Sequence, residues 1–231
     1  VYKQPAIAVP VASLQASATI KPNAGQFEVV LADMQNDVLT RHNNPDHPVI
    51  RLIDDLCQRI KQPVPDVRIT VTSSIPIASG LGSGAALSTA VARALLQYLG
   101  WDMDVADLNN IVYEIEKVYH GTPSGIDNTV IVYEQPVYFI REQPIERLTI
   151  NQPFTLLIAD TGQAALTRIS VADVRKLYES TPKTVMPILE RIGQISRQAR
   201  DIITSREPLQ LGPLMDENHQ LLQRLTVSSD E

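Results

Sequence analysis

Pro76-Ile-Ala-Ser-Gly-Leu-Gly-Ser-Gly-Ala-Ala-Leu-Ser88 joins a strand pattern to a helix pattern through a run of small residues. Upstream, residues 67–72 alternate apolar and polar side chains and are rich in β-branched residues, which predicts a half-buried strand. Downstream, apolar residues recur at three- and four-residue spacings, which predicts a helix over 83–99 that ends at Gly100. The stretch is therefore expected to be a loop that leads from a strand into a helix.

This loop has the composition of an anion-binding site. Glycines at positions 80, 82 and 84 let the backbone approach a ligand without an intervening Cβ. The N–H groups and the positive dipole end of the following helix attract negative charge, so we expect phosphate to bind here. Ser83 is placed either to cap the helix or to offer its hydroxyl to a phosphate-bound metal.

Three better-known loops do not fit the spacing. A P-loop needs a lysine after its last glycine, where this chain has Ala85, and a dinucleotide fingerprint needs G-x-G-x-x-G, whereas the glycines here run G-x-G-x-G. A nucleophile elbow needs glycines two positions either side of Ser83, where Leu81 and Ala85 stand. A plain strand-to-helix turn, with glycines for packing only, stays open as the simpler interpretation.

A second motif places two carboxylates around one turn. A helix is predicted over 105–119, with Asp104 as its cap and Gly121 as its end, and Glu116 falls at the margin of its buried face. The turn-forming run Gly121-Thr-Pro-Ser-Gly-Ile-Asp-Asn128 follows and carries Asp127. Phosphoryl transfer needs one carboxylate for a magnesium ion and another beside the attacking hydroxyl. The simpler alternative is that Glu116 pairs with a surface Lys or Arg and Asp127 caps a helix.

Together the two motifs resemble those of the GHMP kinase superfamily and, within it, its mevalonate kinase branch. The superfamily's phosphate loop has the form Pro-x-x-x-Gly-Leu-Gly-Ser-(Ser or Gly)-Ala-Ala, which residues 76–86 match. The branch carries Glu-(Arg or Lys)-x-x-His-Gly-x-Pro-Ser-Gly-(Ile or Val)-Asp, which residues 116–127 match throughout. Shorter stretches within 1–10, 159–168 and 215–222 are also similar, so the resemblance spans nearly the whole chain.

The resemblance implies ATP-dependent phosphorylation of the 5-hydroxyl of mevalonate, with ATP and Mg²⁺ as cofactors. Asp127 would orient or deprotonate that hydroxyl, Ser83 and Glu116 would hold magnesium, and Thr167 would contact the substrate. The nucleotide phosphates would bind along the loop, at Pro76, Ala78, Ser79, Gly80, Leu81, Gly82, Ser83 and Gly84. Phosphomevalonate kinase, homoserine kinase and a noncatalytic nucleotide-binding relative stay open as alternatives.

Two elements of the family pattern are absent from the sequence. Members begin with a strand ending in Gly-Glu-His, which brings a lysine near the reacting phosphate, and that element would precede Val1. Lys3 is not expected to replace this lysine, because we expect it to be a solvated loop residue. The family's second glycine-rich loop would follow Glu231. Either the sequence is a fragment of a longer product or the chain is naturally truncated.

Composition argues against several kinds of binding partner and location for this chain. The chain has 231 residues, and its net charge of −6 with scattered Lys and Arg argues against nucleic acid. No apolar stretch of 18 residues occurs, so no membrane span is expected. The single cysteine, Cys57, excludes an intrachain disulfide, predicts a packing role and suits the cytoplasm. A homodimer stays open.

The predicted elements indicate an α/β (α+β) chain. The resemblance implies a GHMP kinase-like two-domain fold, with an N-terminal mixed α/β domain over 1–149 and a ferredoxin-like, incomplete C-terminal domain over 150–231. Six short strands are predicted before residue 149, at 6–12, 15–20, 27–31, 67–72, 129–132 and 137–140, and a seventh at 154–159 opens the second domain. Helices are predicted at 47–61, 83–99, 105–119, 170–180, 182–204 and 208–225.

Overall fold

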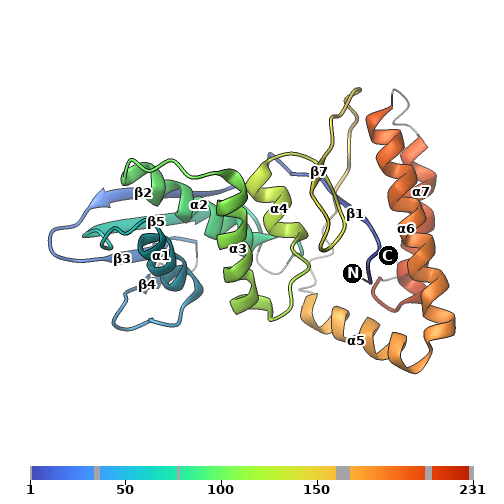
Figure 1. Cartoon of the computed structure of the whole chain (residues 1–231), viewed down its shortest axis with the longest axis horizontal. Coiled ribbons are helices and arrows are strands. Elements are labelled where there is room, and N and C mark those ends of the chain that lie inside the picture. The colour runs from blue at the N-terminus through green and yellow to red at the C-terminus, as the bar shows by residue number, and fades with distance from the viewer. Residues whose placement is uncertain (1, 34–36, 77–78, 160–166, 206–209, 229–231) are drawn as a thin grey trace. The chain divides into compact units, whose positions relative to one another are not determined.

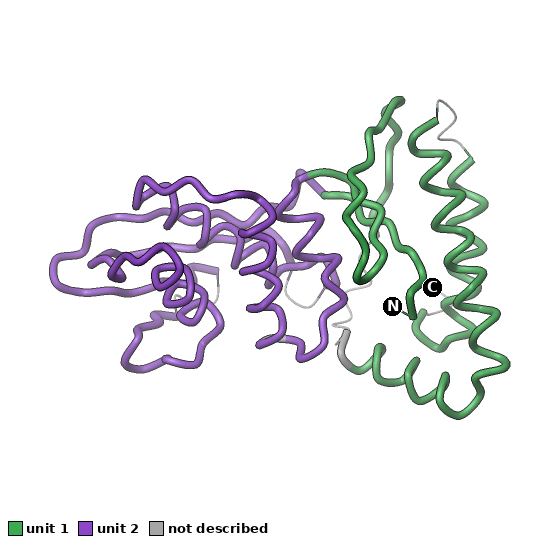
Figure 2. The backbone as a smooth tube through the Cα atoms, in the orientation of Figure 1, with its two compact units in different colours: residues 1–10, 135–231 green, residues 11–134 purple. Residues whose placement is uncertain are grey.

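The computed structural model of the chain describes residues 2–33, 37–76, 79–159, 167–205 and 210–228. The chain divides into two compact units, one formed by residues 11–134 and the other by residues 1–10 together with 135–231 (Figure 2). Both units combine strands and helices, so the predicted mixed α/β class is confirmed (Figure 1). The assignment of 1–149 and 150–231 as domains stays a prediction.

The unit of residues 11–134 is built on a four-stranded sheet. Its strands lie in the order β2 (Ala16–Pro22), β5 (Val67–Ser73), β3 (Glu28–Leu31) and β4 (Asp37–Leu39). β5 runs antiparallel to β2 and parallel to β3, while β3 and β4 are antiparallel. Along β5, Val67, Ile69 and Val71 are buried and Arg68 and Thr72 are exposed, so one face of the sheet is covered.

Helices of the same unit share one core with that face. They are α1 (Pro48–Arg59), α2 (Ser83–Tyr98), α3 (Val105–His120) and α4 (Ile126–Tyr133), and α2 packs on β2 and β5 as well as on α3 and α4 (Figure 1). Their apolar stripes join the sheet in one core, which includes Cys57 at 2% exposure, so its predicted packing role is confirmed. The largest fully buried side chains of this core are Ile50, Leu52, Ile53, Leu56, Ile69, Leu95 and Ile111.

The second unit pairs a small sheet with helices. Its antiparallel strands lie in the order β1 (Ala6–Ala8), β6 (Val137–Phe139) and β7 (Glu146–Arg147). The helices are α5 (Thr167–Ser180), α6 (Pro182–Thr204) and α7 (Leu211–Arg224), and α6 packs against α5, α7 and β1. Within the described residues after 150, these three helices are the regular structure of the expected C-terminal domain.

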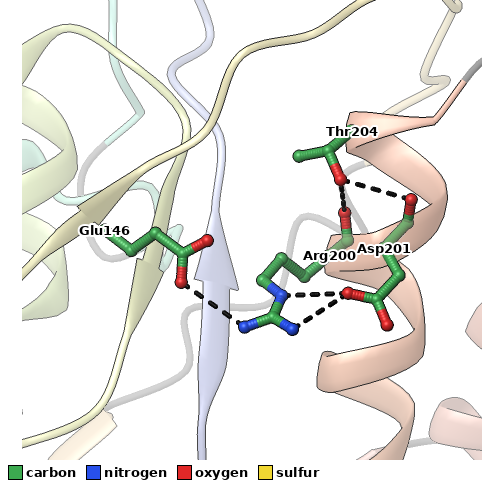
Figure 3. A network of polar contacts seen from close by, with 4 residues as sticks. All are labelled: Glu146, Arg200, Asp201 and Thr204. Carbon is green, nitrogen blue, oxygen red and sulfur yellow. Dashed lines mark hydrogen bonds and ion pairs between the residues drawn. The ribbon is translucent and has the colours of Figure 1, made fainter.

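Arg200 on α6 connects this helix to the small sheet (Figure 3). Its guanidinium lies 3.4 Å from the Glu146 carboxylate on β7, 3.0 Å from the Asp201 carboxylate and 4.8 Å from the centre of the Tyr138 ring. The Thr204 hydroxyl donates to the Arg200 carbonyl at 2.9 Å (Figure 3). These groups are partly exposed, so each ion pair contributes at most about 1 kcal/mol.

Two predicted strands are wrong. Residues 129–132 lie inside α4, because the burial of Val130 and Val132 against neighbouring helices outweighs the strand propensity of β-branched residues. Residues 154–159 form no strand, since no described strand pairs with them, and Leu157 is 95% exposed. The short strands β4 and β7 were not predicted. Among the described helices, none is long and apolar enough to cross a membrane.

Candidate functional site

The loop between β5 and α2 ends at a helix N-terminus that glycine shapes. Gly80 and Gly82 have φ angles of 75° and 69°, in the left-handed region that other residues rarely adopt, and Gly82 is the N-cap of α2. Gly82 has no side chain to cap this helix, so within the described part of the chain the N–H groups of the first turn are left for an external acceptor. Before the glycines, the Ser79 hydroxyl donates to the Pro76 carbonyl at 2.8 Å and tightens the turn. The geometry agrees with the predicted phosphate loop.

Gly82 is also where this loop meets α4. A Cβ built on Gly82 would lie 2.8 Å from Cδ1 of Ile131 and 3.6 Å from Cβ of Asp127, so glycine is needed for the close approach. The N-terminus of α4 also begins at a left-handed glycine, because Gly125 caps it with a φ of 92°, and the Ser124 hydroxyl accepts from the Ile126 N–H at 3.3 Å. Asp127 lies in the first turn of α4. The structure thus places the predicted loop and the predicted catalytic carboxylate side by side.

Glu116 approaches the same place from α3. The Asp104 carboxylate accepts from the Ala106 N–H at 2.7 Å and begins this helix, and Gly121 ends it with a φ of 73°, as the sequence predicts. The Glu116 side chain is only 3% exposed, so it lies deeper than the predicted margin of the buried face. Its Oε1 atom has no hydrogen-bond partner among the residues that the structure describes, and its Oε2 atom lies 3.6 Å from His120 Nε2.

Burial dominates the electrostatics of the two carboxyl groups. Loss of hydration, and secondly the negative charge of Asp127, raise the pKa of Glu116 to about 7. Asp127 remains exposed to solvent, yet surrounding protein atoms displace part of its hydration and raise its pKa, which the nearby His120 opposes. The simpler interpretations lose support, because Glu116 is not on the surface and Gly125, not Asp127, is the N-cap of α4.

The residues present fit a magnesium ion. Glu116 Oε1 is a buried acceptor that no described residue contacts by a hydrogen bond, which a cation would satisfy, and Ser83 begins α2 directly after Gly82. Among the described residues, no group of three or more His, Cys, Asp or Glu side chains could hold a metal by itself. Mg²⁺ does not require one, since it is commonly held by one or two protein ligands together with substrate phosphates and water.

Two predicted site residues lie outside the described part of this unit. Ala78 lies outside the described residues, and Thr167 begins α5 in the other unit. Pro76, Gly80, Leu81 and Gly84 lie in or next to the loop as expected, and all are at least partly accessible to solvent.

Sequence reasoning missed several polar residues near the carboxylates. His120 was read as a partner of the helix dipole, although its four-residue spacing from Glu116 on one helix could have indicated contact. Three buried polar residues, Asn109, Asn128 and Thr129, are 8%, 2% and 1% exposed. Their only sequence signal is that Asn109 interrupts the apolar stripe of α3.

Comparisons with known proteins agree with this geometry. Residues 47–135 match the family model of the GHMP kinases N terminal domain. The mevalonate kinases of Pyrococcus furiosus and Pyrococcus horikoshii are 33% and 35% identical to this chain over 168 residues, which are 71% of this chain and 50% of each relative. The chain therefore spans about half the length of the curated relatives it matches.

A solved structure extends the similarity of fold over almost the whole chain. The crystal structure of L. major mevalonate kinase in complex with R-mevalonate is similar with a TM-score of 0.77, and the match covers 99% of this chain and 72% of that one. Sequence identity in this match is 22%, so it supports the fold alone. The predicted resemblance to GHMP kinases, and to mevalonate kinases among them, is confirmed.

Proposed function

Residues 47–135 are a GHMP kinase N-terminal domain, and from this premise we propose that the chain belongs to an enzyme that phosphorylates the 5-hydroxyl of mevalonate with ATP. The substrate is carried over from the mevalonate kinases at 33% and 35% identity. The reaction class also has support from the residues themselves, because a loop suited to phosphate and two carboxylates are the parts that phosphoryl transfer needs.

The single observation that carries the proposal is the contact at Gly82. The same residue caps the helix whose N–H groups would bind phosphate and lies 3.6 Å, measured from its ideal Cβ position, from Cβ of Asp127. A nucleotide phosphate at this N-terminus would therefore be beside a carboxylate that can orient a hydroxyl. That proximity is the arrangement that transfer between the two requires.

In the proposed reaction, Asp127 accepts a hydrogen bond from the substrate hydroxyl and then takes its proton. The hydroxyl oxygen forms a bond to the terminal phosphorus of ATP, and the bond from that phosphorus to the bridging oxygen breaks, which gives ADP and the phosphate ester. The loop from Pro76 to Gly84 holds the nucleotide phosphates by backbone N–H groups. Thr167 is proposed to contact the substrate.

Glu116 and Ser83 are the residues we propose for magnesium. When bound, the ion would offset the negative charges of the phosphates and of the two carboxylates. Glu116 would then be ionised, because a cation at its unpartnered Oε1 favours the carboxylate form. We also propose a cytoplasmic location, which agrees with the buried free thiol of Cys57, and a homodimer stays a prediction for sedimentation to test.

The test is ADP release by the purified full-length gene product with ATP, Mg²⁺ and one alcohol at a time. Mevalonate should give the largest kcat/KM, well above phosphomevalonate and homoserine. A larger value with either of the other two would reassign the substrate. ATP binding with no turnover on any alcohol would show a noncatalytic relative, and no ATP binding would refute the proposal as a whole.

A further inference from the structure

A buried hydrogen-bond network joins α3 to the turn that carries Asp127. The Asn128 amide nitrogen donates to the Asn109 side-chain oxygen at 2.7 Å, and the Asn109 amide nitrogen lies 3.4 Å from the Thr129 hydroxyl. The Thr129 hydroxyl in turn donates to the carbonyl of Gly125 at 2.6 Å. The network therefore begins on α3 and ends on the residue that caps α4.

The Asn128 amide makes still better contacts when its oxygen and nitrogen are exchanged. The nitrogen then donates to the Gly125 carbonyl at 3.1 Å, and the oxygen accepts from the Thr129 N–H at 3.3 Å. After the exchange the Asn128 oxygen lies 2.7 Å from Asn109 Oδ1, and two oxygens cannot hydrogen-bond to each other. The link between the helices then requires the Asn109 amide to be exchanged as well, so that its nitrogen donates to the Asn128 oxygen.

The two asparagines flank the two carboxylates along the chain. Asn109 precedes Glu116 by seven residues, or about two helical turns, so both project from nearly the same side of α3. Asn128 directly follows Asp127. A hydrogen bond between the two asparagines therefore fixes the rotation and height of α4 against the helix that holds Glu116.

We propose that Asn109 and Asn128 are positioning residues, which hold the Gly125–Asp127 turn at a fixed distance from Glu116 and Gly82. This inference rests on the proposed kinase function and deepens it. Apolar residues would fill the same space without fixing direction, whereas side-chain amides have defined donor and acceptor directions. Both asparagines are buried, with 8% and 2% of their surface exposed, so neither is expected to touch substrate.

Stability and positioning can be separated with two variants. Asn109→Leu removes one partner and leaves the Asn128 amide buried with fewer hydrogen bonds, so its unfolding midpoint should fall. Asn109→Leu/Asn128→Leu removes both partners, which is often nearly neutral for stability. Ile53→Val, in the core on α1, serves as the control for a small loss of stability without a change in this network.

The experiment measures unfolding, MgATP binding, kcat and KM in the full-length gene product, together with amide hydrogen exchange of residues 125–129. We expect both asparagine variants to lose about 10- to 100-fold in kcat, with MgATP affinity within about threefold of wild type. The double variant should regain most of the lost stability without regaining kcat. Exchange should accelerate at residues 125–129 more than elsewhere in α3 and α4, and Ile53→Val should show neither change.

Two results would overturn the inference. One is a double variant whose kcat recovers together with its stability, because the asparagines would then matter for folding alone. The other is unchanged exchange at residues 125–129 in the Asn109→Leu variant. A wild-type protein that binds no ATP and phosphorylates no alcohol would refute the proposed function instead, and the exchange measurement would still decide whether the network holds the turn.

Discussion

Alanine substitutions at three glycines can separate backbone strain, contact with α4 and loss of a phosphate contact, which a single variant would combine. Gly80, Gly82 and Gly100 all have positive φ angles, of 75°, 69° and 65°. An alanine at any of them therefore meets a similar backbone strain, worth roughly 1–2 kcal/mol. They differ in what the new methyl group would contact.

At Gly82 the methyl carbon would lie 2.8 Å from Cδ1 of Ile131, so that flexible side chain must shift and press on α4. At Gly80 and Gly100 no atom of the described residues, apart from the adjacent residues in the chain, lies within 4 Å of the added carbon. The space beside Gly80 is in the loop where we place the nucleotide phosphates, whereas Gly100 follows the far end of α2. Gly100→Ala is thus the matched control for strain alone.

We expect all three variants to lose similar stability in thermal unfolding, with a further loss for Gly82→Ala. Only Gly80→Ala and Gly82→Ala should lose nucleotide affinity. Hydrogen bonds to charged groups contribute about 1.5–3 kcal/mol each, so displacement of one phosphate contact weakens MgATP binding about 10-fold or more. Gly82→Ala should also lower kcat, because it moves Asp127.

Calorimetric titration of MgATP into the three variants decides the matter. If Gly80→Ala and Gly82→Ala bind MgATP as tightly as Gly100→Ala does, the loop is not a phosphate site. The glycines would then serve only the turn between β5 and α2, and the mechanism built on the loop would fail.

Three further predictions concern the carboxyl groups of Asp127 and Glu116 and the proposed substrate contact Thr167. Asp127→Asn should lower kcat by about 100-fold or more and leave the MgATP dissociation constant within a few-fold, which initial rates and calorimetry would show. The folded pKa of Glu116, about 7, lies above its ordinary value of 4.5, so its contribution to stability is full below pH 4.5 and is lost as pH rises to 7. The loss amounts to up to about 3 kcal/mol, and urea unfolding of Glu116→Gln should lack this component, whereas an unchanged pH profile would contradict the assignment. Thr167→Ala should raise the KM for mevalonate without changing the KM for ATP.

Local sequence signals were sufficient for most of the fold. Helices α1, α2, α3, α5, α6 and α7 follow apolar periodicity with clear caps, such as Asp104 before α3 and Gly121 after it. The strand error at 129–132 has a physical cause. Thr-Val-Ile-Val has strand propensity, but the left-handed Gly125 and the contacts of α4 with α2 and α3 decide in favour of a helix.

The sequence motifs were enough to name candidate residues for the site, but not to predict how these residues are arranged in space. Residues 76–84, Glu116 and Asp127 stand in motifs, and their chemistry follows from residue type and spacing. The burial of Glu116 and its raised pKa depend on α2, α3 and α4 packing together, which no local pattern encodes. The asparagine pair was missed for the same reason, because its two members come from different helices.

The site combines a positive helix end with a buried carboxyl oxygen. The first turn of α2 contains no acidic residue, and Glu116 Oε1 is buried with no hydrogen-bond partner among the described residues. Each feature alone would be a cost in stability. A complex of Mg²⁺ with a nucleotide would offset both, because its phosphates would bind at the N-terminus of α2 and its cation would bind Glu116. Binding of the metal without the nucleotide, or of the nucleotide without the metal, satisfies only half of the site. We therefore expect each to bind more weakly alone than the two bind together.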